Sequence, residues 1–503
     1  MPLSDQLQTN IKGLGAAIEI IAEHARNGDS AAALSGDAET WRSTSPTGPP
    51  GNHAAPPEDV RRARRSAVCL AHRLLTLLTE PAEFIQDLAR QNQLLACLHW
   101  LGEFQVLACI PLTGCVPMKD VADLAGVPAT QLFRTIRFTA TAGFLCEPEP
   151  GHVAHTPLSA PFVAELSYLD AAMFLAETAA PAALRMAAAT RRFGDTASQP
   201  AETAYGLAFD AGPRGFQGAL EQRTKLQRQW PAFAGHLVAM EDSISELLGK
   251  LDWTSLGSSC IVDVSGDNAG VAMATALAEN YPSLRFVVQV NNTNNNSSDH
   301  TLSSSSTSTP PSPHITIHPR VPGTLQPITT GAVYILRLAP ALLHWRVRVK
   351  RELAAHWAVL RGNPAATLLL IAPLLLLPES EPERSEADER LGSAGPGFGG
   401  GATAGGRGTA EAGGGGCVEG AARVRDLVLL QLVGWDEEGV VGMRELVQLV
   451  RSVNGNGVNG VSGVNGGGGI DGGCLAVVKK LRLKDSATVA LGIRYQPDQA
   501  GHD

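Results

Sequence analysis

The sequence predicts an α/β protein with two unlike halves: an α-rich N-terminal half that contains a winged helix, and a Rossmann-like C-terminal half. Two patterns support this fold class. Residues 116–162 follow the order helix, turn, helix and hairpin, and from Cys260 onward short apolar runs alternate with helical segments. With 503 residues, 44% of them hydrophobic, the chain is long enough for two or three domains with apolar cores.

The first predicted domain, residues 1–80, consists of helices around a linker. Residues 1–28 and 60–78 carry apolar side chains at helical spacing. Between them, residues 28–57 are rich in Ser, Pro and Gly. Such a composition buries too little apolar surface to offset the conformational entropy lost on ordering. We therefore expect a disordered linker near 28–57.

The second predicted domain, residues 81–165, starts with a long helix from Pro81 to Val106 and ends in the winged helix. Residues 119–125 and 129–142 have helical apolar spacing and are separated by a Gly-Val-Pro turn, whose proline suits the first turn of the second helix. Apolar residues 144–146 and 152–155 flank a Pro- and Gly-containing turn. They predict the hairpin that forms the wing.

Residues 166–250 are rich in Ala and Leu and predict a helical connector, and residues 251–497 predict the Rossmann-like domain. Alternation of strands and helices in this domain implies a largely parallel sheet. The expected strands are residues 260–264, 284–290, 333–338, 367–371, 474–481 and 489–495. Inserts near 291–313, 380–420 and 454–473 are dominated by polar residues and glycine, and we expect them to be disordered loops.

Composition excludes several classes of protein. None of the 8 cysteines stands at the spacing of a zinc site, so we expect no metal and a reducing, intracellular environment. The most apolar run, Ala365 to Leu377, is too short to span a bilayer and is broken by Pro373, so no membrane association is expected. The net charge of -9 disfavours a phosphate backbone as a partner.

Basic residues give little support for direct DNA binding. The second helix of the predicted winged helix carries Arg134 and Arg137, but acidic residues lie nearby in the sequence, and we expect no direct contact with DNA. Arg61 to Arg65 is either a nuclear import signal or a solvated helix face. The basic stretch from Arg346 to Arg351, which includes Arg348, is expected on the exposed side of a helix.

Several segments resemble known proteins. Residues 116–145, 203–209, 281–289 and 333–337 are similar to fungal O-methyltransferases, which implies a class I methyltransferase fold and a dimer formed through the winged-helix domain. Within that group, Arg90 to Leu98 and Ala171 to Pro181 resemble the transcriptional co-activators of aflatoxin-type polyketide gene clusters, including those for aflatoxin, sterigmatocystin and dothistromin. This resemblance implies a zinc-cluster transcription factor as the partner, and action in the nucleus and cytoplasm.

The resemblance also identifies candidate cofactor residues. Methyltransferases of this fold place a glycine-rich turn after the first strand, where backbone approaches S-adenosylmethionine. Here the stretch from Asp263 to Gly270 keeps only Gly266 of the enzyme pattern; Asp263, Gly266 and Gly270 would bind the cofactor if it is bound at all. Gln289 is followed by Val290 rather than by an acid that could accept ribose hydrogen bonds, each worth roughly 1.5–3 kcal/mol.

The candidate general base is His344. The family places this histidine before an aspartate and a tryptophan, whereas here Leu343, His344 and Trp345 are consecutive. His344 is therefore either a base that has lost its neighbouring aspartate or a histidine packed on a helix surface. We expect no catalytic residue, no cofactor and the role of a non-catalytic co-activator. The alternatives are an S-adenosylmethionine-dependent O-methyltransferase that acts on an aromatic polyketide hydroxyl, and a scaffold in a biosynthetic complex.

Overall fold

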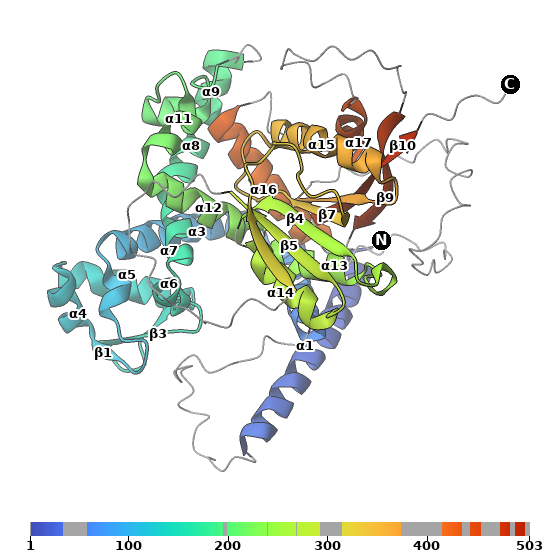
Figure 1. The fold of residues 1–503 in the computed structure, drawn as a ribbon. Helices are drawn as coiled ribbons and strands as arrows, with labels where there is room; N and C mark the ends of the chain where they lie inside the picture. Colours follow the sequence, from blue (N-terminus) through green and yellow to red (C-terminus); the bar gives the residue numbers. More distant parts are fainter. Residues whose placement is uncertain are drawn as a thin grey trace. The chain divides into compact units, whose positions relative to one another are not determined.

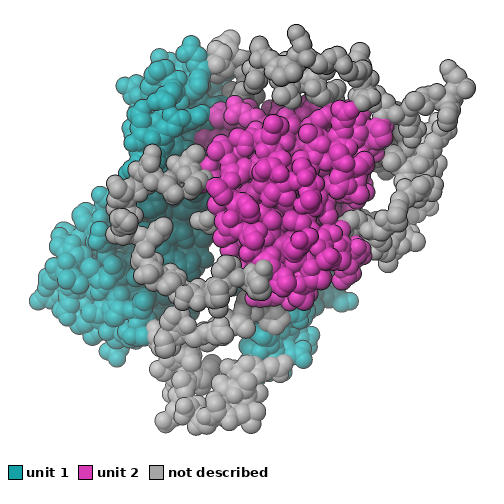
Figure 2. All heavy atoms as spheres, in the orientation of Figure 1, with its two compact units in different colours: residues 1–237, 410–421, 427–434 teal, residues 238–409, 422–426, 435–503 magenta. Residues whose placement is uncertain are grey.

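The computed structural model describes residues 2–33, 58–194, 199–238, 240–267, 269–291, 314–373, 415–434, 443–453, 473–482 and 488–497. The chain forms two compact units, shown in Figure 2. Unit 1 comprises residues 1–237, 410–421 and 427–434, and unit 2 comprises residues 238–409, 422–426 and 435–503. Most of the three inserts expected to be loops lies outside the described residues, although Gly415 to Gly420 is helical and Gly473 begins a strand.

Unit 1 begins with two helices that pack against each other, α1 (Leu3–Ala33) and α2 (Glu58–Leu78). Small residues allow the close approach, because a Cβ at Gly13 of α1 would lie 3.2 Å from a methyl group of Leu70. The first helix was predicted to end near residue 28, but it continues to Ala33. The rest of the predicted linker, residues 34–57, lies outside the described residues.

The following segment has the element order predicted for a winged helix. Its elements are α3 (Pro81–Glu103), the 3-10 turn η2 (Val106–Cys109), β1 (Val116–Pro117), α4 (Met118–Ala125), α5 (Ala129–Thr141), β2 (Leu145–Cys146) and β3 (His152–His155). The three strands form an antiparallel sheet in the order β1-β3-β2. Fully buried side chains of α3, α4 and α5, including Leu101, Met118 and Leu132, form the core of this segment. The predicted long helix ends earlier than expected, at Glu103.

Helices follow the hairpin up to residue 256. Those within the predicted connector, residues 166–250, are α7 (Leu166–Phe174), the π-helical turn η3 (Leu175–Ala179), α8 (Ala180–Leu184), α9 (Met186–Phe193), α10 (Ala204–Phe209), α11 (Gly215–Gln222), α12 (Thr224–Val238) and α13 (Met240–Gly249). The helix α6 (Pro161–Ala164) precedes this range, and the 3-10 turn η5 (Thr254–Leu256) follows it. Buried aromatic rings join several of these helices: Phe174 packs against Trp230 and Phe233 of α12 and against Phe216 of α11.

Unit 2 contains a seven-stranded sheet in the order β6-β5-β4-β7-β8-β10-β9. The strands are β4 (Cys260–Gly266), β5 (Arg285–Val290), β6 (Ile315–Pro319), β7 (Gly331–Arg337), β8 (Thr367–Pro373), β9 (Gly473–Arg482) and β10 (Thr488–Pro497). The pairings among β4 to β8 are parallel, whereas β10 runs antiparallel to both neighbours. The sequence did not predict β6, an edge strand whose residues after Ile315 are exposed.

Helices cover both faces of this sheet (Figure 1). On one face, α15 (Trp345–Gly362) and α17 (Met443–Ser452) pack on Tyr334 and Leu336 of β7. On the other face, α13 and α14 (Ala269–Asn280) pack on Ile261 and Ile335. The helix α16 (Gly415–Val433) is divided between the two units. None of the helices in the described part of the chain is long and apolar enough to cross a membrane.

Candidate functional site

The turn after β4 brings together the three residues predicted to contact a cofactor. Gly266 has a φ of 88°, a left-handed conformation that favours glycine. Gly270 lets α14 approach the sheet, because a Cβ there would lie 3.0 Å from the Asp263 carboxylate and from Val288. The Asp263 carboxylate accepts a 2.8 Å hydrogen bond from the backbone N–H of Ser265. The backbone conformation at Gly266 and the close packing at Gly270 therefore both favour glycine.

A side chain from the neighbouring strand forms ion pairs with both acidic residues of this turn. Arg337, the last residue of β7, lies 3.3 Å from Asp263 Oδ2 and 2.6 Å from Asp267 Oδ1. The Arg337 side chain is only 8% exposed, and its backbone N–H donates a 2.9 Å hydrogen bond to the Ser265 hydroxyl. Burial raises the pKa of the Asp263 carboxyl, and the adjacent guanidinium opposes that shift. Both carboxylates are thus bound by the protein itself.

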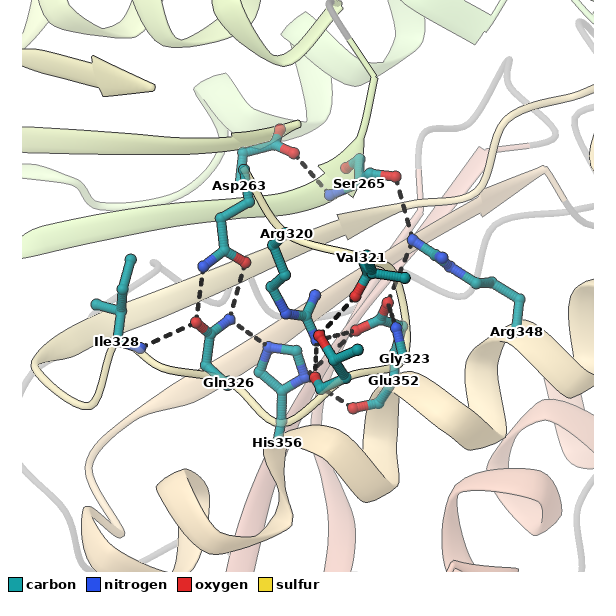
Figure 3. A network of polar contacts seen from close by, with 12 residues as sticks. Asp263, Ser265, Arg320, Val321, Gly323, Gln326, Ile328, Arg348, Glu352 and His356 are labelled. Atoms are coloured by element: carbon teal, nitrogen blue, oxygen red, sulfur yellow. Dashed lines mark hydrogen bonds and ion pairs between the residues drawn. The ribbon is translucent and has the colours of Figure 1, made fainter. Parts of the chain in front are cut away.

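The space next to Gly266 is also filled by the protein. A Cβ added at Gly266 would meet Pro322 at 3.4 Å, Arg348 Nη2 at 3.7 Å and Asn291 at 3.9 Å. Arg348 Nη2 donates a 3.3 Å hydrogen bond to the Ser265 carbonyl (Figure 3). The expectation that Arg348 lies on an exposed helix face is wrong, since its side chain is only 18% exposed. It lies inward because α15 offers Glu352, one turn further on, as a buried partner.

Glu352 is the centre of a buried polar network (Figure 3). Its carboxylate, which is 0% exposed, accepts hydrogen bonds from Arg320 Nη2 at 2.9 Å and from the Gly323 backbone N–H at 2.7 Å. Arg348 Nη2 lies 3.2 Å from the same carboxylate. Because Arg320 and Gly323 belong to the segment that follows β6, Glu352 attaches this segment to α15. We call residues 320–324 the strap.

A second arm of the network reaches the end of β5, where an acidic residue would bind a ribose. Gln289 and Gln326 are both buried and exchange two amide hydrogen bonds, of 2.8 and 3.1 Å. Gln326 Nε2 also lies 2.9 Å from His356 Nε2, and His356 Nδ1 lies 2.7 Å from the Glu352 carbonyl oxygen. The amide therefore donates to Nε2 and the ring donates from Nδ1, which describes a neutral imidazole. Burial lowers the pKa of His356 to about 4.

The structure places His344 on a different segment, in the connection between β7 and α15. His344 is the N-cap residue of α15 and has a left-handed φ of 54°. Its carbonyl oxygen accepts the backbone N–H groups of Val347 and Arg348 at 3.1 and 3.2 Å. The ring is partly exposed. The cofactor turn and His344 thus follow the carboxyl ends of two adjacent parallel strands, β4 and β7.

Sequence comparison identifies the family. No family model matches the chain. It is 39% identical to the dothistromin biosynthesis regulatory protein aflJ of Dothistroma septosporum, over 90% of this chain and 93% of that protein. It is 40% identical to the monodictyphenone cluster transcriptional coactivator mdpA of Emericella nidulans, over 87% and 90% of the two chains. The chain belongs to the family of fungal secondary-metabolite cluster coactivators.

Solved structures show the fold of this coactivator. The structure of LepI in complex with SAM superposes with a TM-score of 0.55 at 14% identity, over 86% of the coactivator and 94% of that chain. OxaC superposes with a TM-score of 0.52 at 14% identity, over 98% and 100% of the two chains. These likenesses, together with the sheet order, confirm the predicted Rossmann-like class I methyltransferase fold.

Sequence reasoning missed most of the residues that fill the site of the coactivator. Arg337 carried a usable signal: it is a charged residue at the end of an apolar strand, two residues beyond Ile335, which pairs with Asp263 in the parallel sheet. Glu352 also carried one, because it lies four residues from both Arg348 and His356 and so shares their helix face. Gln326 lies in an irregular segment and offered no pattern.

Proposed function

We propose that the chain is a non-catalytic, methyltransferase-like transcriptional coactivator that assists a zinc-cluster transcription factor in switching on a polyketide mycotoxin gene cluster. The names of its relatives support the transcriptional role. The bridge from Arg337 to Asp263 and Asp267 supports the loss of catalysis. A cofactor would have to displace this bridge, at the expense of leaving a nearly buried guanidinium without ionic partners.

We further propose that the protein binds no S-adenosylmethionine. Asp263, Gly266 and Gly270 would contact the cofactor in an enzyme, but here Pro322, Arg348 and Asn291 lie against the turn. The amide of Gln289 is used by Gln326. Residues of the protein thus take the contacts that a cofactor needs, and the site does not fit one.

Further parts of the proposal concern partners and location. We propose that residues 81–165 form a winged-helix domain that mediates a homodimer, and that the coactivator acts in the nucleus and cytoplasm without binding DNA directly. Arg137 of α5 supports the last point, because it lies 3.1 Å from Glu147 on the hairpin and is therefore neutralised. The Arg137 guanidinium donates two hydrogen bonds to the Glu147 carboxylate, so a phosphate would have to compete with that carboxylate.

The role of catalysis is tested by complementation. In a strain that lacks the gene, the His344→Asn variant should restore cluster transcripts to the wild-type level, because no reaction depends on the imidazole. Asparagine is chosen since it tolerates the left-handed conformation of this position. Loss of transcripts with a folded variant of normal abundance would support the enzyme instead.

Two binding measurements complete the test. Calorimetric titration of S-adenosylmethionine into the full chain, with an active fungal O-methyltransferase as the positive control, should give no saturable heat. Micromolar binding would favour an O-methyltransferase with His344 as its base. Precipitation of the tagged coactivator from fungal nuclei should recover a zinc-cluster regulator. If no regulator is recovered and deletion leaves cluster transcripts unchanged, the transcriptional proposal is wrong.

A further inference from the structure

A small pocket lies in unit 1, far along the sequence from the residues of the candidate site. Its volume is about 150 Å³, and it is formed by α10, α11, the loop between them and the start of the connection to α12. The pocket is partly open to solvent and has both polar and apolar walls, and its volume is about that of a cavity that accommodates one benzene ring. The lining residues are Tyr205, Phe209 to Gly215, Gly218, Ala219, Gln222 and Arg223.

Tyr205 provides an unmatched hydrogen-bonding group in this pocket. Its side chain is 1% exposed, and its ring packs against Phe209 and Phe216 with centroids 4.8 and 5.2 Å apart. Within the described ranges, its hydroxyl forms no hydrogen bond to any protein group. The hydroxyl is not among the fully buried polar atoms that lack a partner, so it faces the pocket. A ligand in the pocket would be able to bond to it.

Arg223 provides a positive charge at the same place, on a residue that is exposed to solvent. Its guanidinium has no ionic or hydrogen-bond partner among the residues that the structure describes. It lies close enough to Tyr205 to affect that group: burial raises the pKa of Tyr205, and the positive charge of Arg223 counteracts the shift. A carboxylate placed between the two could bind a cation and a hydroxyl donor together.

The remaining charges in the wall limit the ligand to a single negative charge. Arg214 is already paired with Glu221. Asp210 contributes an exposed carboxylate, which repels any anion and repels a dianion such as phosphate more strongly than a monoanion. The N-terminal turn of α11 contributes Gly215 and Gly218 and carries a partial positive charge. The electrostatic balance therefore favours a monoanion.

The wall is also fixed in shape before any ligand binds. A Cβ added at Gly215, whose φ is 54°, would lie 2.1 Å from the Pro200 carbonyl oxygen. The Thr203 hydroxyl caps α10 by accepting a 3.0 Å hydrogen bond from the Gly206 N–H. These contacts hold the segment before α10 against the first turn of α11. Little ordering entropy would be lost on binding, which favours affinity in a small site.

We propose that this pocket binds a small aromatic monocarboxylate, with the carboxylate between Arg223 and the Tyr205 hydroxyl and the ring against Phe209 and Ala219. The ligand is a diffusible small molecule that binds reversibly and without a covalent bond. This inference does not depend on the transcriptional role. It gives the protein a small-molecule site separate from the filled cofactor turn.

Titration of the full chain with benzoate, followed by saturation-transfer NMR and calorimetry, tests the proposal. Benzoate should bind saturably in the millimolar range or tighter, and benzamide, its neutral analogue, should bind at least about tenfold more weakly. Arg223→Gln should weaken benzoate about tenfold or more, and Tyr205→Phe about fivefold. The control Arg134→Gln, at an exposed position on α5, should leave binding unchanged.

Three results would overturn the proposal. The first is that benzoate does not bind at any concentration at which benzoate and the protein stay in solution. The second is that benzamide binds as tightly as benzoate, and the third is that Arg223→Gln binds benzoate as tightly as the wild type. Circular dichroism and the urea midpoint of each variant show whether it is folded. Because Tyr205→Phe keeps the buried ring, it tests the hydroxyl even if another variant is unstable.

Discussion

The carboxyl edge of the sheet in unit 2 and the pocket in unit 1 use polar side chains in opposite ways. At the sheet, each buried charge has an ionic partner within the protein, as Arg337 has Asp263 and Arg320 has Glu352. In the pocket, the Tyr205 hydroxyl and the Arg223 guanidinium have no such partner among the described residues. The comparison shows that a cluster of polar residues does not by itself indicate a ligand, because in unit 2 these groups bind one another. A polar group that faces a pocket without a protein partner is a better indication.

The largest effect is expected from breaking the network at Glu352. Glu352→Gln removes the charge that faces Arg320 and Arg348, whose side chains are 3% and 18% exposed. Removing one member of a buried ion pair leaves an uncompensated charge, so the free energy of unfolding should fall by about 3–5 kcal/mol. Urea denaturation measures the change.

A matched control distinguishes burial from charge alone. Glu221→Gln removes an equivalent charge from the pair with Arg214, but both side chains are about half exposed, at 48% and 61%. The expected loss is below about 1 kcal/mol, because solvent screens an exposed pair. Equal effects of the two substitutions would mean that the network at α15 is no tighter than a surface ion pair.

The next effect is a pH dependence that originates at His356. Burial lowers the pKa of His356 from 6.5 to about 4, so below pH 6.5 the unfolded chain binds a proton that the folded chain refuses. Stability from this group is therefore complete above pH 6.5 and falls as the pH drops towards 4. At 1.36 kcal/mol for each pKa unit, the full change is about 3 kcal/mol.

Variants isolate this contribution from that of the carboxylates. His356→Gln should flatten the fall in unfolding free energy between pH 6.5 and 4, relative to the wild type. His318→Gln, at an exposed position on β6, should leave the profile unchanged. A ring titration by NMR near pH 6.5 would contradict the assignment, because it would show that His356 is accessible to solvent in the folded protein.

The contrast between the two regions also explains what the sequence could reveal. Periodicity predicted the strands from β4 to β10 except β6, which is short, exposed and preceded by a polar insert, and so lacks an apolar signal. The positions of Asp263, Gly266 and Gly270 followed from a local motif. Gln289 was singled out for the missing acid after it, but its actual partner is Gln326, 37 residues away.

Local sequence patterns could not predict interactions between segments that lie far apart in the chain. The strap bonds to α15 through Glu352, and that contact is possible because both segments follow the carboxyl ends of parallel strands, β6 and β7. Likewise, Arg348 was assigned to solvent because its neighbours are basic, whereas the fold supplies a buried carboxylate. Tyr205 was recognised only as part of a family-like segment, since the lack of a hydrogen bond is a property of three-dimensional structure.

A smaller effect is expected from the amide pair. Gln289→Leu or Gln326→Leu alone leaves a buried amide without its partner and should cost about 1–3 kcal/mol. The double variant should lose less than the sum, because neither amide is then stranded against the other. A double-mutant cycle on unfolding free energies measures the coupling. Strict additivity would show that the two amides do not depend on each other.

The smallest effect is expected from removing a single tyrosine hydroxyl in each region. Tyr334→Phe removes a hydroxyl that donates a 2.7 Å hydrogen bond to the Ile328 carbonyl, and should lower the unfolding free energy by about 1 kcal/mol. Tyr205→Phe removes a hydroxyl with no partner in the described structure, and should change stability by less than about 0.5 kcal/mol. Added benzoate should raise the unfolding free energy of the wild type and of Tyr334→Phe by the same amount. It should raise that of Tyr205→Phe by less, because a ligand that binds only the folded protein stabilises it less when its Kd is higher. Without ligand, Tyr205→Phe could instead lower the unfolding free energy as much as Tyr334→Phe does. The Tyr205 hydroxyl would then have a partner within the protein, and the proposed difference between the polar network of unit 2 and the pocket of unit 1 would be wrong.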